Sequence, residues 1–191
     1  MRVLLGVTGG IAAYKAADLT SRLIKLDHEV RVVMTQSATT FVGPLTFEAL
    51  SGNPVMTQAL TTGQGTDGAS AIEHISWAKW AEATIIAPLT ASTLGRLACG
   101  LADDALTTVW MALPLGVPCL LCPAMNTAMW EHPVVQRNLG WLEALERYRV
   151  VAPSHKRLAC GDVGIGGLAE IDEILGALAE VTEAPRGSAG R

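Results

Sequence analysis

The chain has 191 residues, of which half are hydrophobic and 17% are charged, and its formal net charge is −4 at pH 7. This length fits one domain with a sizeable core, and the negative charge gives no electrostatic footprint for nucleic acid. The apolar start MRVLLGV is short and runs into glycines, so it is neither a secretory signal nor a membrane span. We therefore expect a cytoplasmic protein that binds neither nucleic acid nor a membrane.

Strands and helices are expected to alternate along the chain. Apolar runs predict strands at residues 2–7, 29–34, 83–87, 117–122 and 149–152. A helix is expected to begin near Ile11, and PLTFEALSG predicts a short helix that ends at Gly52. The third strand is expected to end at Pro88, with helical segments following as far as Leu113. Two more helices are expected at about 133–146 and 170–181.

This alternation predicts an α/β fold, a single Rossmann-like (flavodoxin-like) parallel sheet with helices on both faces. We expect one domain over residues 1–182 and a disordered tail over 183–191. The polar, glycine-rich residues 61–70 are expected to form a mobile surface loop. In such sheets ligands bind beyond the carboxyl ends of the strands, where the unusual segments of this sequence lie.

The first of these segments is GVTGGIAAYK, which follows the first strand. Gly9 and Gly10 let the backbone approach a ligand, and the next helix offers N–H groups to a phosphate. The spacing is not G-x-G-x-x-G, and the second strand ends without the acidic residue that a dinucleotide site needs. Hydroxyls at Thr35 and Ser37 suit a phosphate, so the pattern favours FMN over NAD. A tight turn without a ligand is the alternative.

A second such turn, APLTAST, follows the third strand with a proline, three hydroxyls and a helix start. Its alternative interpretation is simple N-capping by Thr90 or Ser92.

His74 lies among apolar and aromatic residues, where a histidine is either structural or a general base. In KRLACGDVGIGGLAE, Cys160 sits in a glycine-rich segment that suits a lid, or else is incidental to a surface loop.

All four cysteines are expected to be reduced thiols, because the chain has no export signal. Cys119 and Cys122 form a C-x-x-C, but in a strand their odd separation points the side chains to opposite faces. No second pair of metal ligands accompanies them, so we expect no metal site. The chain is apolar for a monomer, with a mean hydropathy of +0.33, which favours a homo-oligomer.

Six segments in order resemble the flavin-dependent cysteine decarboxylases, a family that includes phosphopantothenoylcysteine decarboxylases and lantibiotic-type peptidyl-cysteine decarboxylases. The segments are GVTGGIAAYK, FVGPLTFEALSGNPV, HISWAKWA, APLTASTLGRLACGLADD, PAMNTAMW and RLACGDVGIGGLAE. The resemblance implies FMN, which oxidises the substrate cysteine to a thioaldehyde; decarboxylation then leaves an enethiol. It also implies a trimer, or a multiple of it, with flavin sites between subunits.

The resemblance also implies the site residues. His74 would be the base, Cys160 would donate a proton to the enethiol, and Asn126 would bind the cysteine carboxylate. The other substrate contacts implied are Met125, Met129, Arg157 and Ala159. The implied FMN contacts are Gly9, Gly10, Ile11, Thr35, Ser37, Thr90, Ala91, Ser92, Thr93 and Ala124.

Three functions follow as alternatives. The first is decarboxylation of 4′-phosphopantothenoylcysteine to 4′-phosphopantetheine in coenzyme A synthesis, which Cys160 favours. The second is oxidative decarboxylation of a peptide C-terminal cysteine in aminovinyl-cysteine biosynthesis. Two departures from the family pattern support it, Ser92 where asparagine is usual and Gly167 where many bacterial coenzyme A enzymes carry arginine. The third is a flavin-binding regulatory protein, which would not need His74, Asn126 and Cys160.

Overall fold

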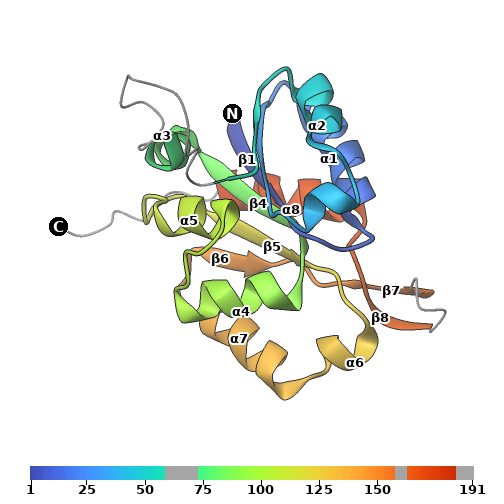
Figure 1. Ribbon diagram of the computed structural model, residues 1–191. Coiled ribbons are helices and arrows are strands. Elements are labelled where there is room, and N and C mark those ends of the chain that lie inside the picture. Colours follow the sequence, from blue (N-terminus) through green and yellow to red (C-terminus); the bar gives the residue numbers. More distant parts are fainter. Residues whose placement is uncertain (59–72, 158–162, 184–191) are drawn as a thin grey trace.

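A six-stranded parallel sheet forms the centre of the molecule (Figure 1). The computed structural model describes residues 1–58, 73–157 and 163–183. The strand order is β3-β2-β1-β4-β5-β6. The strands are β1 (Arg2–Val7), β2 (Glu29–Met34), β3 (Val55–Met56), β4 (Ala83–Leu89), β5 (Cys119–Pro123) and β6 (Tyr148–Val150). Their parallel pairing and the helices between them confirm the fold class expected from the sequence.

Helices cover both faces of the sheet, and each face has its own apolar cluster. Helices α1, α2 and α8 contribute to one cluster, and α3, α4, α5 and α7 to the other. The helices are α1 (Ala13–Lys25), α2 (Pro44–Ser51), α3 (Glu73–Trp80), α4 (Ala91–Cys99), α5 (Ala105–Met111), α6 (Thr127–Trp130), α7 (Pro133–Glu143) and α8 (Ile171–Glu183), with a 3-10 turn at Ala38–Thr40. None of those within the described ranges is long and apolar enough to cross a membrane.

The two cysteines of β5 belong to opposite faces, as the strand geometry predicts. Cys122 packs in the cluster beneath α1 and α8, and Cys119 packs in the cluster beneath α4 and α5. Both are buried, and burial raises the pKa of each thiol. No group of three or more histidine, cysteine or acidic side chains that could hold a metal ion occurs in the described part of the chain. The C-x-x-C is therefore part of the core.

A short antiparallel hairpin of β7 (Ser154–Arg157) and β8 (Val163–Gly167) lies beside the sheet, next to α6 (Figure 1). The backbone N–H of Met125 donates to the carbonyl of Gly166 at 2.9 Å, so the hairpin is bonded to the segment after β5. Glycine is required there: Gly166 has a φ of +147°, and a Cβ on it would collide with the Met125 carbonyl. A Cβ on Gly164 would likewise collide with Thr127.

Several boundaries differ from the expectations. Strand β4 continues through Pro88 to Leu89, where a register shift against β5 accommodates the proline. Helix α7 ends at Glu143, three residues early, and α3, β3 and the β7–β8 hairpin were not expected. The loop expected at 61–70 lies outside the described residues, as does the tail from 184 onward, so the domain bounds stay a prediction.

Candidate functional site

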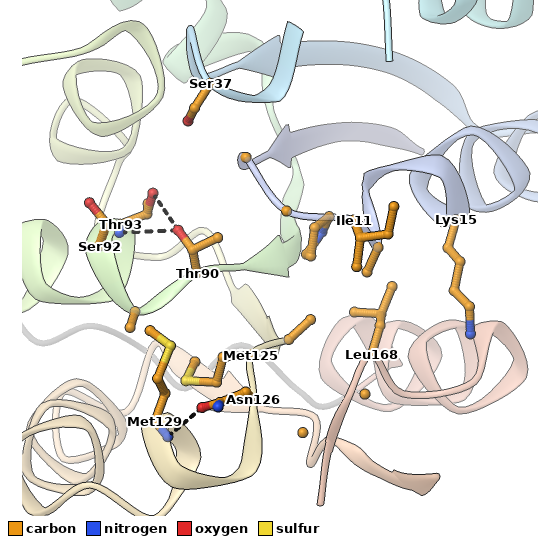
Figure 2. Close-up of a pocket in the computed structure, with 18 of the residues that line it drawn as sticks. Ile11, Lys15, Ser37, Thr90, Ser92, Thr93, Met125, Asn126, Met129 and Leu168 are labelled. Atoms are coloured by element: carbon orange, nitrogen blue, oxygen red, sulfur yellow. Dashed lines mark hydrogen bonds between the residues drawn. The ribbon is translucent and has the colours of Figure 1, made fainter. Parts of the chain in front are cut away.

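A cavity of about 760 Å³ lies at the carboxyl edge of the sheet, beyond β1, β4 and β5 (Figure 2). Its position agrees with the rule that ligands of parallel sheets bind beyond the strand ends. It is lined by many of the residues expected to bind cofactor or substrate: Gly9, Gly10, Ile11, Ser37, Thr90, Ala91, Ser92, Thr93, Ala124, Met125, Asn126 and Met129. The structure therefore brings together segments that are far apart in the sequence.

The turn after β1 is packed tightly against the turn after β2. A Cβ on Gly9 would collide with the Ser37 side chain and lie 2.8 Å from its carbonyl carbon. Thr35 is buried and does not line the cavity; its hydroxyl lies 3.2 Å from that of Ser37. Thr35 thus positions Ser37. Gly6 allows close packing in the core and does not contact the cavity, because a Cβ there would lie 2.9 Å from atoms of both Leu106 and Trp110.

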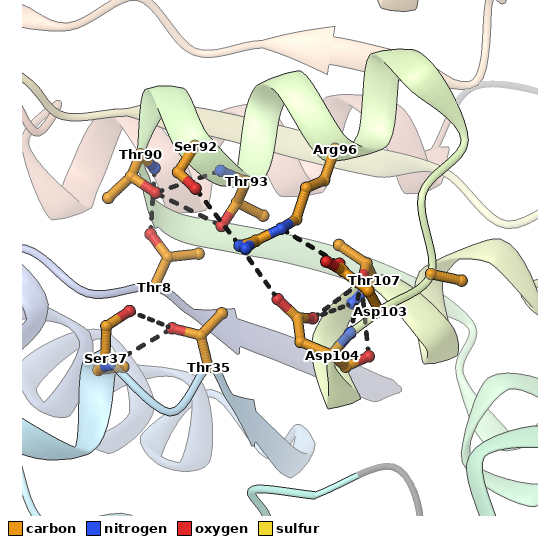
Figure 3. Close-up of polar contacts among 12 residues, drawn as sticks. Thr8, Thr35, Ser37, Thr90, Ser92, Thr93, Arg96, Asp103, Asp104 and Thr107 are labelled. Carbon is orange, nitrogen blue, oxygen red and sulfur yellow. Dashed lines mark hydrogen bonds and ion pairs between the residues drawn. The ribbon is translucent and has the colours of Figure 1, made fainter.

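A buried hydroxyl joins the turn after β1 to the turn after β4 (Figure 3). Thr8 donates to the Pro88 carbonyl at 2.6 Å and accepts from the Thr90 N–H at 3.0 Å. Thr90 in turn caps α4, because its hydroxyl accepts from the Thr93 N–H at 3.4 Å. Thr90 is therefore an N-cap that also lines the cavity, while its contact with FMN stays a prediction.

Arg96 reaches the cavity from the second turn of α4 and is held by several acceptors (Figure 3). Its Nε lies 3.1 Å from Asp103 Oδ1, and its Nη1 lies 3.6 Å from Asp104 Oδ2. Nη1 also donates to the Ser92 hydroxyl at 3.3 Å. Because that oxygen accepts from the guanidinium, the Ser92 hydroxyl hydrogen is left to donate elsewhere.

Asn126 caps the short helix α6 at the floor of the cavity (Figure 2). Its Oδ1 accepts from the Met129 N–H at 2.9 Å, and a backbone N–H can be accepted only by the amide oxygen. The amide orientation is therefore fixed, and the NH₂ group keeps its donors for a ligand. Asn126 is exposed, with Met125 and Met129 beside it.

His74 does not line this cavity. It lies in the first turn of α3, and its Nδ1 is buried and has no hydrogen-bond partner among the described residues. Helix α3 is fastened to β2 by Arg31, whose Cζ lies 4.4 Å from the Trp80 ring centroid and 5.4 Å from that of Trp77. His74 is thus held on a well-packed helix outside the cavity of its own chain.

Of the remaining predicted residues, the structure describes only Arg157. Arg157 is the last residue of β7, and only its backbone is described. Ala159 and Cys160 lie outside the described residues. From the far strand of the hairpin, Gly166 and Gly167 line the cavity, followed by Leu168.

Sequence reasoning missed several cavity residues, including the two cations Lys15 and Arg96. Lys15 could have been found, because it ends the quoted motif GVTGGIAAYK and lies in the first turn of the helix. Arg96 lies four residues after Ser92, so a helical spacing would have placed it on the same face. The described lining includes no carboxylate. Two cations, several hydroxyls and two helix N-termini make the cavity suitable for an anionic ligand such as FMN.

Comparison with known proteins identifies the family. The model of the Flavoprotein family matches residues 1–183. The chain belongs to this family. This flavoprotein is 46% identical over 174 residues to the probable phosphopantothenoylcysteine decarboxylase of Streptococcus mutans, which covers 91% of the chain and 94% of that relative. It is also 46% identical to the coenzyme A biosynthesis bifunctional protein CoaBC of Bacillus subtilis, over 96% of the chain and 44% of that relative.

Solved structures give the same result. A cysteine-to-serine mutant of PPC decarboxylase complexed with pantothenoylaminoethenethiol matches with a TM-score of 0.85 and 34% identity, over 96% of this chain and 98% of that chain. The FMN binding protein AtHal3 matches with a TM-score of 0.80 and 35% identity, over 96% of this flavoprotein and 97% of that chain. These findings confirm the family and the FMN cofactor expected from the sequence.

Proposed function

We propose that this flavoprotein catalyses the FMN-dependent decarboxylation of 4′-phosphopantothenoylcysteine to 4′-phosphopantetheine. The observation that carries the proposal is the fixed amide of Asn126 at the floor of a cavity whose described lining has no carboxylate. Relatives at 46% identity are named for this decarboxylation or for coenzyme A biosynthesis. The chain is thus an FMN-dependent cysteine decarboxylase.

Asn126 binds the carboxylate of the substrate cysteine. Its oxygen is committed to the cap of α6, so the amide presents N–H donors, which suit an anion. A neutral amide stabilises the carboxylate less than an arginine would. This difference favours catalysis, because tight binding of a charge that is lost with CO₂ would stabilise the ground state.

The other residues of the cavity hold the cofactor and shield it. Bound FMN supplies an acceptor for the two electrons that leave the cysteine Cβ–S unit. Ser37, Thr90 and Ser92 offer hydroxyls, and the N-termini of α1 and α4 add positive potential for its phosphate. Met125 and Met129 provide an apolar wall on the substrate side.

The active assembly is a homo-oligomer, a trimer or a multiple of it, in which His74 of one copy serves the cavity of another. The position of His74 supports this, because it lies outside the cavity of its own chain while Asn126 lies inside. Exposed apolar side chains such as Leu115 and Trp141, 85% and 57% accessible, also suit contacts between copies. Cys160 donates the proton to the enethiol, and Arg157 and Ala159 contact the substrate.

Mass spectrometry of the purified holoprotein incubated with 4′-phosphopantothenoylcysteine tests the reaction. A product lighter by about 44 mass units, from loss of CO₂ alone, is expected. A parallel incubation uses a peptide that ends in cysteine. A peptide product lighter by about 46 mass units, from decarboxylation with net oxidation, would instead favour the peptide substrate. Absence of any product with both substrates would refute the decarboxylase assignment.

Complementation between subunits tests the shared site. His74→Asn should keep FMN but lose about 10²–10⁴-fold in turnover, the usual contribution of a general base. Asn126→Ala should also be inactive. If sites form between copies, refolding the two inactive variants together regenerates intact sites and restores part of the activity. Mixtures that stay inactive, although they form mixed oligomers, would place His74 and Asn126 of one chain in the same site.

A further inference from the structure

Arg96 restricts the hydroxyl of Ser92, one turn before it on α4 (Figure 3). Arg96 Nη1 donates to Ser92 Oγ at 3.3 Å, and Ser92 is exposed at the wall of the cavity. The Ser92 hydroxyl makes no other hydrogen bond within the described part of the chain. An unbonded serine hydroxyl rotates freely, but here the oxygen accepts from a guanidinium, so the hydrogen must point away from it. Ser92 is therefore a donor whose direction Arg96 sets.

Arg96 is itself held by the start of α5. Its Nε lies 3.1 Å from Asp103 Oδ1, and its Nη1 lies 3.6 Å from Asp104 Oδ2. Asp104 is fixed in turn, because its Oδ1 accepts from the Thr107 N–H at 2.7 Å in the capping box of α5. Ion pairs with this exposure add little stability, so their consequence is geometric. The planar fork of an arginine suits the arrangement, since it bonds carboxylates and a hydroxyl at the same time.

The neighbouring hydroxyls are used within the turn after β4. The Thr90 hydroxyl accepts from the Thr93 N–H and donates to the Thr93 hydroxyl, each at 3.4 Å. The Thr8 hydroxyl donates to the Pro88 carbonyl. Neither hydroxyl keeps a hydrogen for a ligand, whereas the Ser92 hydrogen is available to an acceptor in the cavity.

The N-termini of α1 and α4 indicate which end of FMN lies near Ser92. Helix α1 begins without a side-chain cap, so its free N–H groups suit the phosphate, whereas Thr90 already occupies an N–H group of α4. We infer that Ser92 donates to an acceptor atom of the flavin ring, and that Arg96 is the positioning residue that orients this hydroxyl. The inference goes beyond the decarboxylation, because it concerns the affinity and the reduction potential of bound FMN.

A double-mutant cycle tests whether Arg96 acts through Ser92. Apoprotein of wild type, Ser92→Ala, Arg96→Met and the double variant is titrated with FMN at one fixed protein concentration, and flavin fluorescence is followed. Each single substitution should weaken FMN binding by roughly 3–10-fold, the equivalent of one hydrogen bond. Arg96→Met should cause no further loss when Ser92→Ala is present. Riboflavin, which lacks the phosphate, should give the same ratios, because the lost contact is to the ring.

The midpoint potential of bound FMN is a second readout, which a merely structural role of Arg96 would not move. A donor to a ring acceptor stabilises the electron-rich reduced flavin more than the oxidised form. Ser92→Ala and Arg96→Met should therefore both lower the potential, and the double variant should match Ser92→Ala.

Arg22→Met is the matched control. The Arg22 side chain is 36% exposed, as is that of Arg96, and it pairs with Asp172 at 2.8 Å without lining the cavity. FMN affinity and potential should stay at the wild-type values in this variant. Asp103→Ala is the second variant where Arg96→Met does not fold; it should weaken FMN binding by a smaller factor, and not at all when Ser92→Ala is present.

Three outcomes would overturn the inference. Additive losses in the cycle would mean that Arg96 acts on FMN directly. Losses for FMN but not for riboflavin would place the contact at the phosphate. Wild-type affinity and potential in Arg96→Met would leave Ser92 without a positioning residue. Failure of the proposed decarboxylation is a separate result, because none of these measurements uses the substrate.

Discussion

The turns after β1 and β4, which both face the cavity, differ in how the N-terminus of the following helix is capped. After β1, Ala12 precedes α1 without any side-chain cap, and the turn depends on glycine packed against Ser37. After β4, Thr90 caps α4, and the buried Thr8 hydroxyl holds the turn from below. The second turn satisfies its own polar groups, whereas the first leaves an uncapped N-terminus at the cavity. We conclude that the β4 turn is formed without a ligand, and that the β1 turn supplies binding potential to an anion.

Gly9→Ala should have the largest effect, because it places a Cβ against the backbone of Ser37 as well as its side chain. Overpacking of this kind destabilises by up to about 3 kcal/mol. The measurement is denaturant unfolding of the apoprotein at one fixed protein concentration, since oligomer stability depends on concentration.

Gly10→Ala is the control for this prediction. A Cβ on Gly10 would meet only Thr90 Cγ2 at 3.7 Å, which is ordinary contact. Its unfolding free energy should stay close to that of wild type. Equal destabilisation by the two substitutions would mean that the tight approach to Ser37 is not what constrains this turn.

Thr8→Val should have the next largest effect, because it breaks the link between the two turns. The substitution keeps the shape but leaves the Pro88 carbonyl and the Thr90 N–H without the Thr8 hydroxyl. Buried groups that lose their partner cost about 1–3 kcal/mol, so we expect a loss near 2 kcal/mol in apoprotein unfolding. FMN affinity should fall as well, because Thr90 lines the cavity.

Thr20→Val provides the comparison within the same fold. Thr20 is as deeply buried as Thr8, but its hydroxyl donates only to the Ala16 carbonyl one turn earlier in α1. That carbonyl keeps its helical hydrogen bond after the substitution, so the loss should be smaller. If Thr20→Val costs more than Thr8→Val, the bridging role of Thr8 is wrong.

The sheet and the edge that carries the site could be predicted because they depend on local pattern. Strands β1 and β2 were predicted to the residue, and Gly52 ends α2 in the left-handed conformation that favours glycine. The turn motifs also placed most cavity residues correctly. Alternating strands and helices fix which ends of the strands meet, so proximity of these motifs follows from topology alone.

What the sequence did not predict depends on tertiary contacts. Strand β8 is rich in glycine, and two of its glycines, Gly164 and Gly166, are explained only by the approach of Thr127 and Met125. The role of Thr8 depends on two groups about 80 residues away. Likewise, no local signal places His74 outside the cavity of its own chain, because that position follows from how Arg31, Trp77 and Trp80 pack.

Thr90→Ala should have the smallest effect of the series. The cap is worth about 0.5–1 kcal/mol, towards the lower end because its hydrogen bond to the Thr93 N–H is 3.4 Å long. Asp104→Ala is the comparison for a stronger cap and should cost more unfolding free energy. Asp104 caps α5 in a full capping box, with a 2.7 Å hydrogen bond from the Thr107 N–H. We expect apoprotein unfolding to rank Asp104→Ala as the more destabilising.

The β4 turn should nevertheless keep its shape in Thr90→Ala, because Thr8 still accepts from the residue 90 N–H and donates to the Pro88 carbonyl. A larger loss for Thr90→Ala than for Asp104→Ala would show that the cap, and not the Thr8 bridge, holds this turn.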